Sequence, residues 1–123
     1  SLTEIGVLYW KYIPAFFRFG NDVDLDPCPV NKNYQLIRNI LAIGVNKDGS
    51  VSDKNSHVLL IYDERNPAFM KGGNGFKSYA EMRAALKRPN MLRKCSWQRI
   101  THCIRKNNVL PWLTDQLAAK YGL

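Results

Sequence analysis

The chain has 123 residues, of which 46% are hydrophobic and 11% aromatic. This size and composition suit one folded domain and exclude a disordered tail. No apolar run approaches the roughly 20 residues that span a bilayer, and the N-terminus lacks the layout of a signal peptide. The three cysteines, at irregular spacing, do not form a disulfide framework, so we expect a cytoplasmic protein without a membrane partner.

The net charge of +8 is unevenly distributed along the chain. Residues 65–106 hold eleven of the eighteen lysines and arginines and a single acid, Glu81, whereas residues 1–64 hold more acids than bases. An asymmetry of this kind favours a partner with a phosphate backbone. The alternative is a solvated basic face that serves solubility.

The first half of the chain predicts two helices separated by a loop. Residues 3–18 carry apolar side chains at helical spacing, and Pro14 predicts a kink or an early end. Residues 20–32 are rich in Gly, Asp and Pro, which predicts a loop. Residues 33–45 predict the second helix, with Gly44 near its end and one apolar face formed by Tyr34, Ile37, Ile40 and Leu41.

The second half predicts alternating strands and helices. The apolar run 58–62 predicts a strand buried on both faces, and residues 72–75 predict a mobile turn. Ser78 and Glu81 have the spacing of a capping box for a helix that must end before Pro89. The remaining predictions are a strand at residues 91–95, a helix capped by Ser96 and a last helix from Pro111 to about Tyr121.

Strand, helix, strand and helix in this order predict a parallel βαβ unit. We therefore expect a single α/β domain over residues 1–123, with a small mixed or parallel sheet flanked by helices.

Two groups of polar residues follow the two predicted strands. Asp63-Glu64 could bind a divalent metal, or could be a solvated strand end with Arg65 as its local partner. Ser96-Trp97-Gln98 would lie at the same end of a parallel sheet. There Gln98 could hold a water or a base edge, or be a surface residue beside a buried Trp97.

Cysteine and histidine residues offer a weaker possibility of a metal site. Cys95, His102 and Cys103 are soft ligands, but no fourth ligand is evident near them. We interpret the cysteines as buried free thiols and expect no metal bound by this group.

Three segments carry a resemblance to a known superfamily. They are Tyr34-Gln35-Leu36-Ile37-Arg38-Asn39, Leu59-Leu60-Ile61-Tyr62-Asp63-Glu64-Arg65-Asn66-Pro67 and Leu92-Arg93-Lys94-Cys95-Ser96-Trp97-Gln98. Together, over about residues 34–100, they resemble a branch of the PD-(D/E)xK nuclease superfamily. The resemblance implies a restriction-endonuclease-like α/β core and Mg²⁺-dependent cleavage of phosphodiester bonds.

The chain departs from that superfamily in one respect: its acid-x-lysine triplet is absent. The nearest segments, Glu81-Met82-Arg83 and Asp63-Glu64-Arg65, end in arginine, which stays protonated and cannot help to deprotonate an attacking water. The start Ser1-Leu2-Thr3-Glu4 is similar to the segment that follows the catalytic lysine in the branch. The chain would then be the C-terminal portion of a longer nuclease-like protein, with an incomplete sheet whose exposed edge pairs with a second copy.

The sequence thus predicts a nuclease-like domain that acts on DNA and is truncated or lacks the catalytic triplet. Mg²⁺ is expected only with a complete active site. Glu64 and Gln98 are the candidates for peripheral site residues, and the candidates for backbone contacts are Lys87, Arg88, Arg93, Lys94 and Arg99. The competing prediction is a non-enzymatic module whose basic face binds RNA or an acidic protein.

Overall fold

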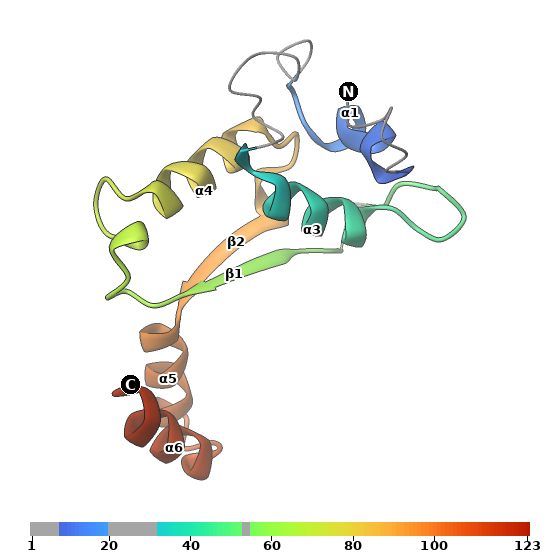
Figure 1. Ribbon diagram of the computed structural model, residues 1–123. Helices are drawn as coiled ribbons and strands as arrows, with labels where there is room; N and C mark the ends of the chain where they lie inside the picture. The colour runs from blue at the N-terminus through green and yellow to red at the C-terminus, as the bar shows by residue number, and fades with distance from the viewer. Residues whose placement is uncertain (1–7, 20–31, 53–54) are drawn as a thin grey trace. The chain divides into compact units, whose positions relative to one another are not determined.

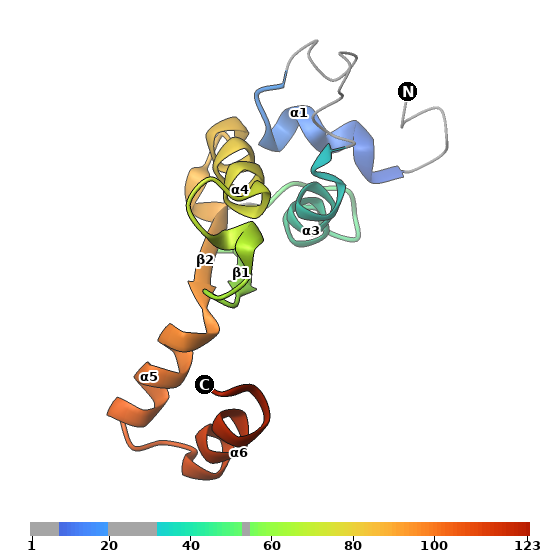
Figure 2. The same cartoon turned by 60° about the vertical axis from the view of Figure 1, so that its left-hand side comes forward.

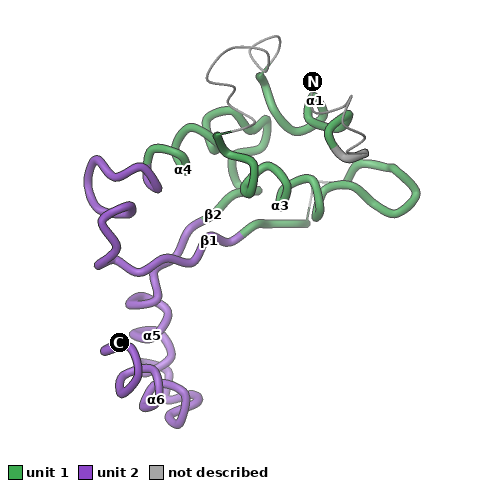
Figure 3. Tube along the Cα trace, in the orientation of Figure 1, with its two compact units in different colours: residues 1–58, 77–93 green, residues 59–76, 94–123 purple. Residues whose placement is uncertain are grey.

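The computed structural model describes residues 8–19, 32–52 and 55–123. Its elements follow the chain from a short N-terminal helix to two C-terminal helices (Figure 1). The chain divides into two compact units, coloured separately in Figure 3. Unit 1 comprises residues 1–58 and 77–93, and unit 2 comprises residues 59–76 and 94–123.

The N-terminal segment is less helical than its apolar spacing predicts. Instead of one helix over residues 3–18, a 3-10 helix η1 (Leu8–Tyr12) leads into a single turn, α1 (Ile13–Phe16). Pro14 lies in the first turn of α1, where its missing N–H costs nothing. The chain then extends because Phe17 bridges Leu86 in antiparallel fashion. Residues 3–7 of the predicted helix, and residues 20–31 of the predicted loop, lie outside the described residues.

The second predicted helix is confirmed as α3 (Tyr34–Gly44). Ile37, Ile40 and Leu41 recur on one face and are fully buried. Gly44 is the last helical residue, and a Cβ at this position would lie 2.4 Å from the ring of Phe16. Close packing against Phe16, rather than a left-handed cap, therefore explains the glycine.

The two predicted strands are confirmed as β1 (Val58–Tyr62) and β2 (Leu92–Ser96), which form a two-stranded parallel sheet. The crossover helix α4 (Asn74–Ala85) connects them, and Figure 2 shows it beside the start of β2. The Tyr79 hydroxyl donates to the Leu92 carbonyl at 3.4 Å, which fixes the helix to the strand. The α/β class and the βαβ unit are thus confirmed.

The expectation that β1 is buried on both faces is wrong. Its residues alternate between half-buried and exposed, and Leu59 and Ile61 are 51% and 40% exposed. The half-buried Tyr62 packs on Phe69 and Phe76, with ring centroids 5.0 and 6.1 Å away. Side chains from the crossover therefore cover one face of this strand, and a second layer would be needed to bury the other.

The start of the crossover helix also differs from its prediction. Helix α4 begins at Asn74, so Ser78 lies inside it and does not cap it. Glu81 instead pairs with Lys32, whose Nζ lies 3.0 Å from Oε2. Residues 72–75 are not a free turn, because Gly73 packs so closely on the 3-10 turn η3 (Pro67–Phe69) that a Cβ would lie 2.4 Å from two carbonyl oxygens. The end of α4 at Ala85, before Pro89, is confirmed.

The two C-terminal helices are confirmed. Helix α5 (Trp97–Lys106) follows Ser96, which accepts a hydrogen bond from the Arg99 amide. Helix α6 (Pro111–Tyr121) begins at the proline, and Gly122, which follows its last residue, has a left-handed φ of 66°.

Among the described residues, the apolar core lies in unit 1. The buried hydrophobic side chains of these residues are Trp10, Ile13, Phe16, Phe17, Phe19, Ile37, Ile40, Leu41, Tyr79, Met82, Leu86, Met91 and Leu92. Among the described residues of unit 2, the buried side chains are those of Ser96, Thr101 and Thr114. Both threonine hydroxyls donate to carbonyls of their own helix. Unit 2 therefore depends more on hydrogen bonds and half-buried rings than on a dry core.

Candidate functional site

Polar side chains gather where β1 and β2 end. We call Asp63, Glu64, Arg65, Ser96 and Gln98 the strand-end cluster; all five belong to unit 2. Parallel strands bring their carboxyl ends to the same edge of a sheet, where sites in open α/β sheets collect. The expectation that Asp63-Glu64 and Ser96-Gln98 lie together is confirmed by the hydrogen bonds between them.

Gln98 joins the two strand ends through both atoms of its amide group. Its Nε2 donates to Asp63 Oδ1 at 2.7 Å, and its Oε1 accepts from the backbone N–H of Glu64 at 3.1 Å. The amide can do this because it carries a donor and an acceptor side by side. Gln98 therefore holds the residues after β1 against the first turn of α5.

Asp63 is held on its other side by Arg65. The guanidinium donates from Nε to Oδ1 at 2.9 Å and from Nη2 to Oδ2 at 2.7 Å, and the Arg65 amide adds a bond to Oδ1 at 2.9 Å. These bonds and that from Gln98 hold the pKa of Asp63 well below its usual range, and the carboxylate raises the pKa of Arg65. Both oxygens of Asp63 are engaged, as expected for a strand end with Arg65 as its partner.

Arg65 also forms a hydrogen bond with the last residue of helix α6. Its Nη2 donates to the carbonyl oxygen of Tyr121 at 2.9 Å, which links the residues after β1 to the end of α6. The sequence gives no signal for this contact, because the acceptor is a backbone atom 56 positions away.

Glu64 stabilises the start of α5 through Ser96. The Ser96 hydroxyl donates to Glu64 Oε1 at 2.6 Å and accepts from the Arg99 amide at 3.0 Å. The buried hydroxyl thus caps the helix and orients the carboxylate at once. Sequence reasoning identifies the cap but misses the bond to Glu64.

The described residues contain no group of three or more His, Cys, Asp or Glu side chains placed to hold a metal ion. Cys95 is half-buried and Cys103 is exposed, so the interpretation of buried thiols is wrong for Cys103, and Cys28 lies outside the described residues. Trp97 is 39% exposed, so it is not a core residue.

The candidates for backbone contacts are divided between the two units. Lys87, Arg88 and Arg93 belong to unit 1, whereas Lys94 and Arg99 belong to unit 2.

Four of these candidates are engaged within the chain: Arg88, and the three whose contacts follow. Lys87 Nζ donates to the Pro14 carbonyl at 2.6 Å, and Arg93 Nε donates to the Asn90 carbonyl at 3.3 Å. Lys94 Nζ lies 3.9 Å from the centroid of the Phe76 ring. These contacts give each side chain a structural role before any partner binds.

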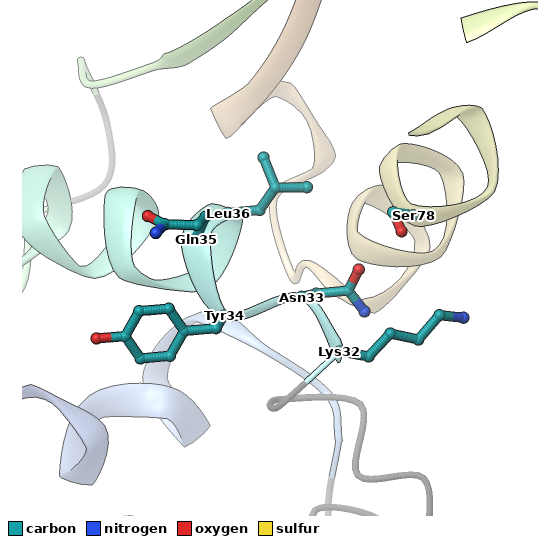
Figure 4. Close-up of a pocket in the computed structure, with 6 residues that line it drawn as sticks. All are labelled: Lys32, Asn33, Tyr34, Gln35, Leu36 and Ser78. Carbon is teal, nitrogen blue, oxygen red and sulfur yellow. The ribbon is translucent and has the colours of Figure 1, made fainter. Parts of the chain in front are cut away.

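A separate pocket lies in unit 1. Its volume is about 340 Å³, and it is lined by Lys32, Asn33, Tyr34, Gln35, Leu36 and Ser78 (Figure 4). No residue of the strand-end cluster lines it.

A parallel βαβ unit with polar groups at its strand ends is consistent with a restriction-endonuclease-like domain, and comparison with protein families gives the same class. The family described as "Restriction Endonuclease associating with ARP" matches residues 3–122, and the chain belongs to this family. The match covers almost the whole chain and supports the restriction-endonuclease-like class that the sequence predicts. No curated protein and no solved structure matches the chain. Of the described helices, none has the length and apolar character needed to cross a membrane.

Proposed function

We propose that this chain is a PD-(D/E)xK-type nuclease-like domain that binds DNA through its basic residues. Membership of a restriction endonuclease family carries the proposal. The charge supports it, because residues 65–106 combine eleven lysines and arginines with one acid.

Cleavage would need more than the strand-end cluster. Nucleases of this type need a carboxylate that holds a metal and a lysine that orients the attacking water. Both oxygens of Asp63 are engaged by Arg65 and Gln98, and the sequence contains no acid-x-lysine triplet. We therefore propose Glu64 and Gln98 as positioning residues at the edge of a site, and Mg²⁺ as its cofactor only where an acid-x-lysine strand completes it.

Two assays on the same preparation test this proposal. We expect salt-sensitive binding of duplex DNA in a gel-shift titration, and no nicking of supercoiled plasmid with Mg²⁺ or Mn²⁺. Metal-dependent nicking by this chain alone would contradict the proposal that cleavage needs an acid-x-lysine strand. Absence of binding at low salt would remove the DNA-binding proposal, since counterion release predicts strong low-salt affinity.

A non-enzymatic module that binds RNA or an acidic protein is the second candidate function. The family description names an association with ARP, which favours a binding role. The RNA or acidic protein would then bind basic residues of segment 65–106. Competition distinguishes the partners: an RNA hairpin or an acidic polypeptide that displaces DNA at far lower concentration than unlabelled duplex would favour this candidate.

We also propose that two copies of the chain pair through the sheet. Among the described residues, the sheet has only two strands, so each strand has an unpaired edge, and Leu59 and Ile61 are exposed on β1. Light scattering at increasing concentration checks this. A monomer at the highest concentration would contradict it, and a dimer should dissociate when Ile61 is replaced by Lys.

A further inference from the structure

Helix α5 is amphipathic, with one basic face. Arg99, His102 and Lys106 are three and four positions apart, so they lie along one side of the helix, and all three are exposed. Thr101, on the other side, is buried, and Ile100 and Ile104 are half-buried. The helix contains no acid. We call Arg99, His102 and Lys106 the α5 stripe.

The side chains of the stripe make no polar or ring contact, which distinguishes them from most other basic residues that the structure describes. Within the part of the chain that the structure describes, no hydrogen bond, ion pair or ring contact involves these three side chains. By contrast, Arg105 of the same helix donates to the carbonyls of Thr114 and Leu123. Arg105 therefore fastens α5 to the α6 end of unit 2, while the stripe remains available.

The length of the stripe fits a phosphate backbone. With a rise of about 1.5 Å per residue, Arg99 and Lys106 lie about 10 Å apart along the helix axis. One strand of a duplex presents a phosphate about every 3.4 Å of rise along the duplex axis, and the spacing along the strand itself is wider. The stripe is therefore long enough to contact more than one phosphate of the same strand. Arginine, histidine and lysine side chains all donate hydrogen bonds to phosphate oxygens.

We propose that helix α5 is the principal DNA-binding element of this chain and lays the α5 stripe along one strand of the phosphodiester backbone. This inference rests on the proposed DNA-binding function and names the surface that performs it. We propose the stripe as the main DNA contact in place of Lys87, Arg93 and Lys94, because the side chains of these three residues are already engaged within the chain. The strand-end cluster supports the helix through the Ser96 cap and the Gln98 contact at its first turn.

The test measures binding to a duplex of about 20 base pairs by fluorescence anisotropy across a series of salt concentrations. The test variant is R99Q/K106Q. The matched control is R38Q/K47Q, which removes the same charge from two exposed residues of unit 1. Each lost phosphate contact lowers the salt slope by about 1, so we expect the test variant to lose about 2 and the control almost nothing. We also expect affinity to fall at least tenfold for the test variant at low salt.

A gain-of-function variant keeps the test decisive if R99Q/K106Q fails to fold. His102→Lys adds a lysine ammonium group to the stripe, and we expect tighter binding with a steeper salt slope. Equal losses in the test and control variants, or no change for His102→Lys, would overturn the role of the stripe while leaving wild-type DNA binding intact. The role would also be overturned if R99Q/K106Q lost affinity for an RNA hairpin but kept its affinity for the DNA duplex. Failure of the wild-type chain to bind any duplex would instead contradict the proposed function itself.

Discussion

At the residue scale, Gly44 shows how one close approach constrains the N-terminal core. A Cβ there would lie 2.4 Å from the Phe16 ring, which is itself only 2% exposed and cannot move aside. We expect Gly44→Ala to destabilise the fold by about 1–3 kcal/mol, although alanine is the better helix former. Urea unfolding measures this change.

Shortening the facing side chain provides the control for Gly44→Ala. Phe16→Leu removes ring atoms that the new methyl group would meet, so the double variant should lose less stability than the sum of the two single variants. Strictly additive losses would show that Gly44 is required for another reason.

Asp63 gives the fold a predictable dependence on pH. The pKa of this carboxyl is lowered by the Arg65 side chain, the Arg65 amide and Gln98. Between the lowered folded pKa and the unfolded pKa of about 3.9, the unfolded chain binds more protons, so stability rises with pH in that window. The contribution is complete above the unfolded pKa and is lost as pH falls towards the folded pKa.

The measurement is the midpoint of urea unfolding between pH 2 and pH 5. We expect the wild-type midpoint to fall more steeply on acidification than that of Asp63→Asn, because the amide cannot titrate. Asp115→Asn removes the same charge from an exposed position on α6 and so controls for the change in net charge. Parallel curves for wild type and Asp63→Asn would contradict the pairing with Arg65 in solution.

At the element scale, Ser96 decides how α5 begins. Its hydroxyl accepts from the Arg99 amide and donates to Glu64, so Ser96→Ala removes a cap and leaves the carboxylate without that partner. We expect a loss of about 1–2 kcal/mol in urea unfolding. Glu64→Ala should add little to Ser96→Ala, because the bond to the hydroxyl is then already absent.

Ser78→Ala is the matched control for the cap. Ser78 lies inside α4 rather than at its start, so this substitution should change stability by less than about 0.5 kcal/mol. A loss of stability as large as that of Ser96→Ala would instead support the capping box that the sequence predicts at Ser78.

The elements could be predicted wherever a local pattern is sufficient to determine them. The spacing of Ile37, Ile40 and Leu41 predicts α3, and Ser96 and Pro111 predict the starts of α5 and α6, all within one residue. The start of α4 could not be predicted, because packing of Gly73 on the carbonyls of η3 allows the helix to begin at Asn74.

The candidate site was predictable to a similar extent. Parallel strand ends must meet, which brings Asp63-Glu64 to Ser96-Gln98. The open face of Leu59 and Ile61 was not predictable, because an apolar run is the same whether one or two layers cover it. The hydrogen bond from Arg65 to Tyr121 was not predictable either, because its acceptor is a backbone carbonyl that no residue type in the sequence indicates.

At the scale of the whole molecule, the two units differ in how they are stabilised. In the ranges that the structure describes, the buried apolar side chains lie in unit 1, whereas the strand-end cluster and α5 lie in unit 2. Regions with few buried apolar contacts open locally at lower free energy. We therefore expect backbone amides of α5 and α6 to exchange with deuterium faster than those of α3, as measured by mass spectrometry of peptides from each helix.

Binding of duplex DNA should slow deuterium exchange mainly in helix α5. A ligand that binds only the folded form slows local opening, and the effect is largest where it makes contact. At saturating DNA, protection should rise most in peptides covering residues 97–106 and least in those covering α3. Protection that rises equally in both helices would show that DNA stabilises the chain as a whole. Protection that rises mainly in residues 87–93 would place the contact on the side chains that the structure shows already engaged.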